Sequence, residues 1–235
     1  SWDHANPSNG DYFNSSRTAT VTVTEHNFDP SLFTLEGDGT LSGWVSSGDR
    51  HTATVSFTED GSYSFSISGR DLAGNESNVY ESGVFNIDAT MPELEVSGVE
   101  QGVSYKKDVG FSIRMSDNNI DTSRTYVSLV GKNNGNIRIN GTLNSTTGTY
   151  EFTNFPEEEL YDDVYTLNAV VVDLAGNTNE QEIVFSVNRF GSSYEFIDSD
   201  LLNSYMNTAS DVVITETNVD RLDMSKARVV VSLNG

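Results

Sequence analysis

The chain has 235 residues, no cysteine and a formal net charge of −22. This acidic excess argues against nucleic acid and anionic membrane surfaces as partners, because both attract clusters of lysine and arginine. The missing cysteines exclude a disulfide scaffold, a thiolate metal site and a cysteine nucleophile. No apolar run approaches the roughly 20 residues of a transmembrane helix, so membrane insertion of this segment is not expected.

A five-residue sequence, Asp-Leu-Ala-Gly-Asn, occurs at residues 71–75 and again at 173–177. Tyr63 lies eight residues before the first copy, and Tyr165 lies eight residues before the second. The resulting period of about 100 residues fits one small β-sandwich per repeat and is too long for a solenoid unit of about 20–50 residues. The repeat indicates a modular binding or spacer protein rather than a single active site.

Apolar and polar residues alternate with period two along much of the chain, which is typical of β-strands. Strands are predicted at residues 19–24, 52–57 and 63–69. In the second repeat, alternate residues from Tyr165 to Val171 are expected to face one side of a strand. No segment shows a helical period, and turn residues recur about every 8–12 residues. The predicted fold class is therefore all-β, with tandem antiparallel β-sandwiches.

A second sequence pattern recurs three times and supports the repeat. It is found at residues 24–29, 116–121 and 215–220. We expect Asp29, Asp121 and Asp220 to accept hydrogen bonds from nearby backbone amides where a strand ends. The third copy is followed by a strand-like run at residues 229–235 but by no Asp-Leu-Ala-Gly-Asn sequence. The chain is therefore predicted to hold two complete repeats and the N-terminal half of a third.

The predicted domains are residues 10–88, residues 92–188, and a connector with the half repeat at 189–235. Residues 89–92 form a short linker, in which proline disfavours helix. The connector carries Phe190, Tyr194 and Phe196, so we expect it to be packed. A half-sandwich exposes unpaired strand edges, so the third portion is expected to pair with the second repeat or with another chain.

Several segments together carry a family resemblance. They are residues 11–14 before a Thr/Val strand, the turn at 24–29, the run Gly-Ser-Tyr-Ser-Phe at 61–65, the copy at 71–75, and the run at 85–92. The chain resembles the bacterial immunoglobulin-like (Ig-like) domains of large surface proteins from Gram-positive, Clostridia-type bacteria. The resemblance implies Ig-like β-sandwiches, export from the cell, and a place in a multidomain stalk or adhesin. The second repeat departs from the pattern, because it lacks the Gly-Ser-Tyr-Ser-Phe form before residue 173.

The repeated Asp-Leu-Ala-Gly-Asn sequence has two interpretations. The first is a hairpin turn between the last two strands of each repeat, in which glycine supplies a positive φ and the Asp and Asn side chains bond to backbone amides. The second is a calcium site at a domain tip, where a linker carboxylate would add to the about six to eight oxygen ligands that calcium takes. The candidate calcium ligands are Asp71, Asn75, Asp88, Asp173 and Asn177.

The aromatic residues are interpreted as structural. Tyr63 and Tyr165 are predicted to be tyrosine corners, whose hydroxyl bonds back to the backbone. Trp44 is predicted to lie on a central strand and to pack in the core rather than serve as a platform for a sugar. An exposed aromatic pair near Trp44 would favour ligand binding, whereas a buried Trp44 would favour a spacer.

No motif indicates catalysis. The acids at residues 157–159 and 162–163 could suggest a paired-carboxylate glycosidase, but such a charged loop is usually solvated. No nucleophile elbow accompanies the serines, and His4, His26 and His51 form no His-rich metal sequence. The chain is therefore predicted to have no catalytic residues and not to be an enzyme.

The combined prediction is a non-enzymatic, extracellular spacer or adhesion segment of a bacterial surface protein, at the cell wall or secreted. Its expected partners are neighbouring Ig-like repeats of a longer chain, with calcium as the candidate ion. Two alternatives stay open. One is a module that binds a glycan or host protein, and the other is an accessory domain of a carbohydrate-active enzyme. The abrupt ends at Ser1 and Gly235 favour a segment of something larger.

Overall fold

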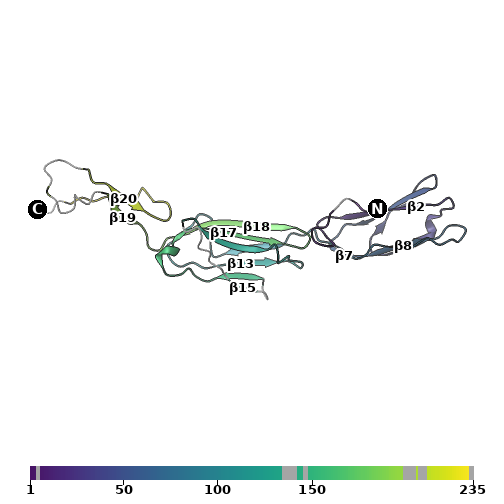
Figure 1. Cartoon of the computed structure of the whole chain (residues 1–235), viewed down its shortest axis with the longest axis horizontal. Helices are drawn as coiled ribbons and strands as arrows, with labels where there is room; N and C mark the ends of the chain where they lie inside the picture. The colour runs from purple at the N-terminus through teal and green to yellow at the C-terminus, as the bar shows by residue number, and fades with distance from the viewer. Residues whose placement is uncertain (4–5, 134–141, 145–147, 198–204, 206–210, 233–235) are drawn as a thin grey trace. The chain divides into compact units, whose positions relative to one another are not determined.

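The computed structural model consists of β-strands and connecting loops (Figure 1). It describes residues 1–3, 6–133, 142–144, 148–197, 205 and 211–232. The only helical elements among these residues are two short 3-10 turns, Pro30–Leu32 and Glu159–Tyr161. No helix in this part of the chain is long or apolar enough to cross a membrane. The all-β prediction is confirmed.

The chain forms two compact units. The first comprises Ser1–Glu93, Ser116–Thr125 and Val171–Asn179. The second comprises Leu94–Met115, Tyr126–Val170 and Glu180–Gly235. These units divide the chain by contacts in space, whereas the repeat boundaries 10–88, 92–188 and 189–235 stay predictions from the sequence.

The first repeat contains three small sheets. The first sheet has the order β2-β6-β4, with β5 also paired to β6, from Arg17–Thr24, Arg50–Phe57, Thr40–Leu41 and Val45–Ser47. The second has the order β3-β8-β9, from Phe33–Gly37, Phe65–Gly69 and Tyr80–Glu81. The third has the order β1-β10-β7, from Tyr12–Phe13, Phe85–Ile87 and Gly61–Tyr63.

The core of the first repeat follows the predicted alternation. Every second side chain of β6 is buried, including Ala53, Val55 and Phe57. Val55 and Phe57 belong to one hydrophobic cluster with the buried aromatic side chains Phe65 of β8 and Phe85 of β10. Burying such side chains contributes roughly 1.5–3 kcal/mol each, so the period-two pattern is what holds the sheets together.

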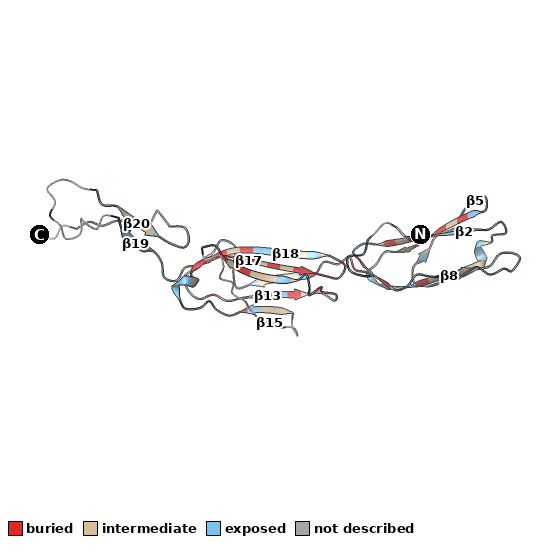
Figure 2. Ribbon diagram, in the orientation of Figure 1, coloured by how far each residue is buried: buried red, intermediate tan, exposed pale blue. Residues whose placement is uncertain are grey.

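The second repeat has two four-stranded sheets. One has the order β11-β13-β16-β15, from Glu93–Ser97, Phe111–Ser116, Thr149–Phe152 and Thr142–Asn144. The other has the order β12-β18-β17-β14, from Ser104–Tyr105, Thr178–Val187, Asp163–Val172 and Tyr126–Gly131. Figure 2 shows buried residues alternating along β17, where Tyr165, Leu167 and Ala169 are buried as predicted.

Two short strand pairs are parallel rather than antiparallel. β1 pairs with β10, and β12 pairs with β18, in parallel. In the second repeat the chain leaves β11 in one sheet and joins the other sheet at β12. Gly98 lies at this crossover with a φ of 94°, and a side chain there would collide with the backbone carbonyl of Gly110. The crossover therefore needs glycine.

The third portion is a two-stranded ribbon. β19 (Ser193–Phe196) pairs antiparallel with β20 (Ile214–Thr217). The expectation that the connector aromatics are packed is wrong, because Phe190, Tyr194 and Phe196 are 54%, 64% and 47% exposed. Among the described residues, these two strands form a sheet of their own. The run at 229–232 is not a strand, and residues 198–204, 206–210 and 233–235 lie outside the described residues.

Candidate metal centre

The two copies of the repeated turn have the same hydrogen bonds. In the first copy, Asn75 donates its backbone N–H to Asp71 Oδ1 at 2.8 Å and its Nδ2 to Asp71 Oδ2 at 2.7 Å. In the second, Asn177 donates the same two groups to Asp173, at 2.8 and 2.6 Å. Each turn connects the strands on either side of it, β8 to β9 and β17 to β18. The hairpin interpretation is confirmed.

Each copy of the turn has a glycine at the same position, and this glycine has a positive φ. Gly74 and Gly176 both have a φ of 90°, a conformation that costs other residues about 1–2 kcal/mol. The residue that follows each aspartate then reaches the second sequence pattern of its repeat. Leu72 N–H donates to the carbonyl of Asn27 at 3.1 Å, and Leu174 N–H donates to the carbonyl of Asn119 at 2.7 Å. The two recurring patterns therefore meet at one tip of each repeat.

A cluster of three carboxylates lies within the first compact unit. Asp88, Asp117 and Asp173 each place one carboxylate oxygen within 4.8 Å of the others. Asp88 follows β10, Asp117 follows β13 and Asp173 follows β17. Asp88 and Asp173 are buried and Asp117 is half-buried. Carboxylates at this separation repel one another unless a proton or a cation lies between them.

Two asparagine side chains hold the cluster in place. Asn119 donates its Nδ2 to Asp88 Oδ2 at 3.0 Å and its backbone N–H to Asp117 Oδ1 at 2.6 Å. Asn177 donates its Nδ2 to the backbone carbonyls of Asp88 and Thr90, at 2.7 and 3.1 Å. The linker that carries Asp88 is thus bonded to the turn at residues 116–121 and to the turn at residues 173–177. Each carboxylate oxygen can accept more than one bond, so these N–H donors leave carboxylate lone pairs that a cation could bind.

The surroundings of Asp117 raise the pKa of its carboxyl group. Burial raises the pKa of its carboxyl above the usual value, and the negative charges of Asp88 and Asp173 raise it further. The hydrogen bond from the Asn119 N–H acts in the opposite direction. A carboxyl whose charged form is disfavoured by its neighbours would be stabilised in that form by a bound cation.

The structure brings together some of the candidate ligands and not others. Asp88 and Asp173 are in the cluster, and Asn177 borders it. Asp71 and Asn75 belong to the other copy of the turn, and no group of three metal-ligating side chains among the described residues includes Asp71. At the position that corresponds to Asp117, the first repeat has a glutamate, Glu25, which accepts a hydrogen bond from the backbone N–H of Asn27.

Asp117 and Asn119 were not among the candidate ligands predicted from the sequence. Both lie in the second recurring pattern, at residues 116–121. This copy of the pattern contains four acidic or amide side chains close together, which was the available signal. The sequence did not indicate that this pattern lies beside the linker and the turn at residues 173–177.

All three aspartates expected to bond to backbone amides do so. Asp29 Oδ1 accepts from the Ser31 N–H at 2.9 Å. Asp121 Oδ1 accepts from the Ser123 N–H at 2.9 Å, and Asp121 Oδ2 from Arg124 Nε at 2.6 Å. The Ser123 and Arg124 hydrogen bonds lower the pKa of Asp121 to about 2. The structural interpretation of these two residues is confirmed.

Asp220 also bonds to a nearby backbone amide, and it has a further role. Its Oδ1 accepts from the Arg221 N–H at 2.7 Å, and its Oδ2 accepts the hydroxyls of Ser104 and Ser186, each at 2.5 Å. Asp223, three residues later, accepts the Ser225 N–H at 3.1 Å. The sequence pattern did not indicate the two serine partners of Asp220.

The acidic loop at residues 157–163 is only partly solvated. The side chains at 157–159 are exposed, as expected, but Asp162 and Asp163 are buried. Asp162 Oδ1 pairs with Arg189 Nε at 2.7 Å. Asp163 accepts hydrogen bonds from Asn133, including Nδ2 at 2.8 Å. Both carboxylates are buried where a cation or amide donors satisfy them, which corrects the expectation of a wholly solvated loop.

Both tyrosine corners are confirmed. The Tyr63 hydroxyl donates to the carbonyl of Glu59 at 2.7 Å, and the Tyr165 hydroxyl to that of Tyr161 at 2.6 Å. The prediction for Trp44 is wrong in part, because Trp44 lies between β4 and β5 rather than on a strand. It is half-buried, with ring centroids 5.0 Å from Phe28 and 5.6 Å from Phe33.

A family model described as bacterial Ig-like domain matches residues 93–189. This segment therefore resembles a bacterial Ig-like domain. The match covers the two four-stranded sheets, the tyrosine corner at Tyr165 and the turn at 173–177. No curated protein matches the chain.

Several solved structures are similar to the chain. A tetra-tandem repeat from the extending region of a large adhesion protein is 18% identical, with a TM-score of 0.37, covering 89% of this chain and 57% of that one. The Yersinia pseudotuberculosis adhesin InvE is 15% identical, with a TM-score of 0.30, covering 74% of this chain and 55% of that one. The C-terminal domain of the Streptococcus agalactiae AgI/II polypeptide BspA is 12% identical, with a TM-score of 0.24, covering 76% of this chain and 95% of that one. The chain thus spans little more than half of the first two.

Proposed function

We propose that this chain is a non-enzymatic spacer or adhesion segment on the outside of a bacterial cell, and that calcium stabilises it at the carboxylate cluster. The observation that carries the calcium proposal is the meeting of Asp88, Asp117 and Asp173 within 4.8 Å. The match of residues 93–189 to the bacterial Ig-like family supports the placement on a surface protein. In this proposal the repeats hold neighbouring parts of the parent protein at a distance from one another. A bound cation joins Asp88 of the linker to Asp117 and Asp173, which belong to the turns at residues 116–121 and 173–177.

The donor set favours calcium over a transition metal. All three groups are carboxylates, and no histidine is among them. Hard oxygen ligands suit calcium or magnesium. Asp88 and Asp117 line a cleft of about 400 Å³, together with Tyr12 and Asp60. Water in an open cleft can complete the coordination shell that calcium requires, since three carboxylates supply only part of it.

Asp60 is not counted as a ligand. Its Oδ1 accepts from the Ala89 N–H at 2.7 Å, and its Oδ2 accepts from the Thr90 hydroxyl at 2.6 Å. These bonds lower its pKa, so it remains charged and adds to the negative potential of the cleft. It therefore helps to attract a cation without contacting it.

Calorimetric melting of the full chain with calcium, with magnesium and with a chelator tests the ion. Ligand linkage predicts a stabilisation of about 2.7 kcal/mol when free calcium is at a hundredfold excess over its Kd. A smaller effect of magnesium would support calcium, because magnesium requires stricter octahedral geometry. Identical melting curves in calcium and in chelator would show the ion proposal to be wrong.

The surface location is tested separately. Antibodies raised against the chain are expected to label intact cells of the source bacterium without permeabilisation. Labelling that requires permeabilisation would contradict an extracellular spacer or adhesin, whatever the result with calcium.

A further inference from the structure

A parallel strand pair lies between the entrance and the exit of the second repeat. β12 follows the crossover at Gly98, and β18 ends where the chain leaves this repeat. Backbone hydrogen bonds join residues 102–105 to residues 184–188, and we refer to these two segments as the clamp. The bonds run from the Gly102 N–H to the carbonyl of Val184 at 2.7 Å, from the Ser186 N–H to that of Val103 at 3.0 Å, and from the Asn188 N–H to that of Tyr105 at 2.8 Å.

The direction of the two strands decides how tension acts on the clamp. A pull on the chain at both ends of the repeat draws β12 towards its N-terminal side and β18 towards its C-terminal side. Because the strands are parallel, these two directions are opposite and lie along the strands. The evenly spaced hydrogen bonds of a parallel pair therefore share the load, whereas bonds that are pulled from one end of a pair break one after another.

Asp220 bridges the two strands of the clamp. Its Oδ2 accepts the Ser104 hydroxyl of β12 and the Ser186 hydroxyl of β18, each at 2.5 Å. The two serine oxygens lie 2.8 Å apart. Each hydroxyl has one hydrogen and a carboxylate only accepts, so both hydrogens are directed at Asp220. Ser186 is 2% exposed and the Asp220 side chain is 17% exposed, so water competes little for these bonds.

The bridging carboxylate comes from the next part of the chain. Asp220 follows β20, so it belongs to the third portion, whereas both serines belong to the second repeat. Hydrogen bonds to a charged group are about twice as strong as those between neutral groups. A single oxygen atom accepts both hydroxyls, so β12 cannot slide past β18 until at least one of the two bonds breaks.

The first repeat has the same strand pair without this bridge. β1 and β10 are parallel, and Tyr12 and Asn86 take the places of the two serines. Asp121, which matches Asp220 in the sequence pattern, bonds to residues of its own turn instead.

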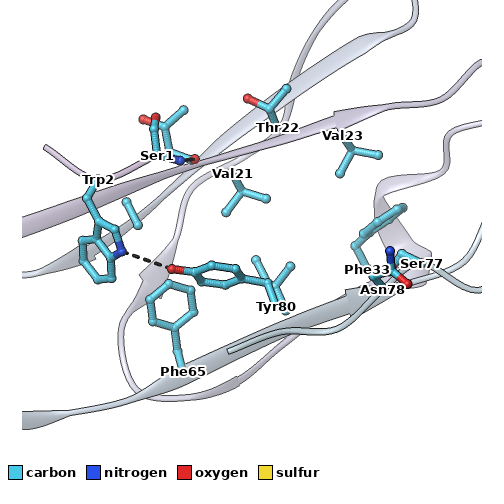
Figure 3. A pocket seen from close by; sticks show the side chains of 13 residues that line it. Ser1, Trp2, Val21, Thr22, Val23, Phe33, Phe65, Ser77, Asn78 and Tyr80 are labelled. Carbon is cyan, nitrogen blue, oxygen red and sulfur yellow. Dashed lines mark hydrogen bonds between the residues drawn. The ribbon is translucent and has the colours of Figure 1, made fainter. Parts of the chain in front are cut away.

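A different side-chain bond connects the first segment of the chain to β9. Figure 3 shows the Trp2 indole N–H bonded to the Tyr80 hydroxyl, at 3.1 Å, beside a cavity of about 340 Å³. Trp2 pairs with Ala19 of β2, and Tyr80 lies on β9. All three residues belong to the first compact unit, so this bond stays within one unit of the fold. The bridge at Asp220 instead makes one repeat depend on the chain that follows it.

We propose that the clamp carries tension through the second repeat and that Asp220 strengthens it, so that the resistance of this repeat to stretching depends on the third portion of the chain. The use of such a clamp rests on the proposed spacer or adhesion role, because a segment that holds a cell to a surface is pulled at both ends. The clamp itself is tested on the purified chain. A negative result in the cell-labelling experiment or in the calcium experiment therefore leaves this test unaffected.

Single-molecule stretching of the full chain tests the clamp. The chain has no cysteine, so Glu100→Cys with Phe190→Cys supplies two attachment points, at exposed side chains on either side of the clamp. This geometry loads β12 and β18 along their length and leaves the third portion unloaded. Glu100→Cys with Glu182→Cys is the matched control, because the strand register places residues 100 and 182 at the same end of the pair. The first geometry is expected to unfold the repeat at a higher force than the control.

Variants stretched at constant force in the first geometry test the bridge. Asp220→Ala is expected to raise the unfolding rate about tenfold, since it removes two hydrogen bonds to a charged group. Asp220→Asn keeps an accepting oxygen and is expected to raise it less. Ser104→Ala removes one donor from β12, so it tests the bridge even if Asp220→Ala changes the third portion. Asp223→Ala is the matched control and is expected to leave the rate unchanged, because Asp223 lies in the same portion and bonds to Ser225 of its own turn.

The outcomes separate the clamp from the bridge. A higher force in the first geometry, with faster unfolding in Asp220→Ala and Ser104→Ala, supports the proposal. Equal forces in the two geometries would show that this strand pair does not carry the tension. An unchanged rate in Asp220→Ala would overturn the role of its carboxylate. The same increase in Asp223→Ala would also overturn it, because the effect would then come from the folding of the third portion and not from the bond to the two serines.

Discussion

The hydroxyl of Tyr165 donates a 2.6 Å hydrogen bond to the backbone carbonyl of Tyr161. Tyr63 makes the corresponding bond to Glu59, but Tyr63 is half-buried whereas Tyr165 is 1% exposed. Tyr165→Phe is expected to lower the free energy of unfolding by about 1–3 kcal/mol, because it leaves a buried carbonyl without its partner. Tyr63→Phe is expected to cost less, since water can replace the hydroxyl. Urea denaturation of both variants checks this, and a larger loss in Tyr63→Phe would contradict it.

Asp162 and Arg189 form an ion pair with little access to solvent. Their side chains are 2% and 10% exposed, and Arg189 also pairs with Asp108, which is 52% exposed. Asp162→Ala is expected to cost about 3–5 kcal/mol of unfolding free energy, because it leaves a buried guanidinium without its main partner. Asp108→Ala is the matched control and is expected to cost about 1 kcal/mol or less. Equal losses in urea denaturation would mean that burial does not distinguish the two pairs.

The low pKa of Asp121 predicts a loss of stability in acid. Hydrogen bonds from Ser123 and Arg124 lower this pKa from 3.8 to about 2. The charged form is therefore bound more favourably in the folded chain, so its contribution is present above pH 3.8 and is lost as the pH falls towards 2. Asp121→Asn is expected to be less stable than the parent at neutral pH and to lose less stability on acidification. Parallel slopes of stability against pH in this interval would contradict the assignment.

Asp173 and Asp71 occupy the same turn in the two repeats, so they form a matched pair for the metal centre. Asp173→Asn is expected to abolish the stabilisation by calcium, because it removes one of three clustered carboxylates. Asp71→Asn is expected to leave it unchanged. In chelator, Asp173→Asn also relieves the repulsion in the cluster, which offsets part of its cost. Calcium titrations followed by melting check both variants, and an equal calcium response in both would contradict the site.

The raised pKa of Asp117 makes calcium affinity depend on pH. A ligand carboxyl must lose its proton before it binds a metal. Affinity is therefore expected to fall as the pH drops through the raised pKa of Asp117, above the range in which an ordinary aspartate would respond. Isothermal titration calorimetry of the parent chain at several pH values measures this. A calcium affinity that stays constant as the pH falls, until the range of an ordinary aspartate is reached, would contradict a role of Asp117 as a ligand.

Asp220 is expected to anchor the third portion of the chain. It accepts hydroxyl hydrogen bonds from Ser104 and Ser186, whereas Asp223 bonds only within its own turn among the described residues. Asp220→Ala is expected to increase the rate of limited proteolysis within residues 190–232, and Asp223→Ala is expected to change it little. Mass spectrometry of the fragments gives the rates. Equal cleavage rates in Asp220→Ala and in the parent would show that these bonds do not hold the ribbon.

Much of the local structure could be predicted because its causes are local. Alternation along Thr52–Phe57 and around Tyr165 reflects the side-chain period of a strand, which needs no knowledge of neighbours. The turns at 71–75 and 173–177 depend on a glycine at positive φ and on bonds between residues two to four apart. The tyrosine corners likewise join residues four apart in the sequence.

Errors arose where a side chain's role depends on a distant partner. Asp220 and Asp121 are equivalent in the sequence pattern, but Asp220 also accepts hydrogen bonds from two serines of β12 and β18, which the pattern did not indicate. Asp162 belongs to an acidic loop that was expected to be solvated, but it forms an ion pair with Arg189. Phe190 was expected to be packed, but its side chain is 54% exposed.

The sequence by itself determined the repeat, the strands and the two hairpin turns, because periodicity and turn chemistry act over a few residues. Only the tertiary structure decided that Asp117 joins Asp88 and Asp173, and that Asp220 meets Ser104 and Ser186. Both features depend on which strands become neighbours. That choice is made by the packing of the whole sandwich, through contacts between residues far apart in the chain.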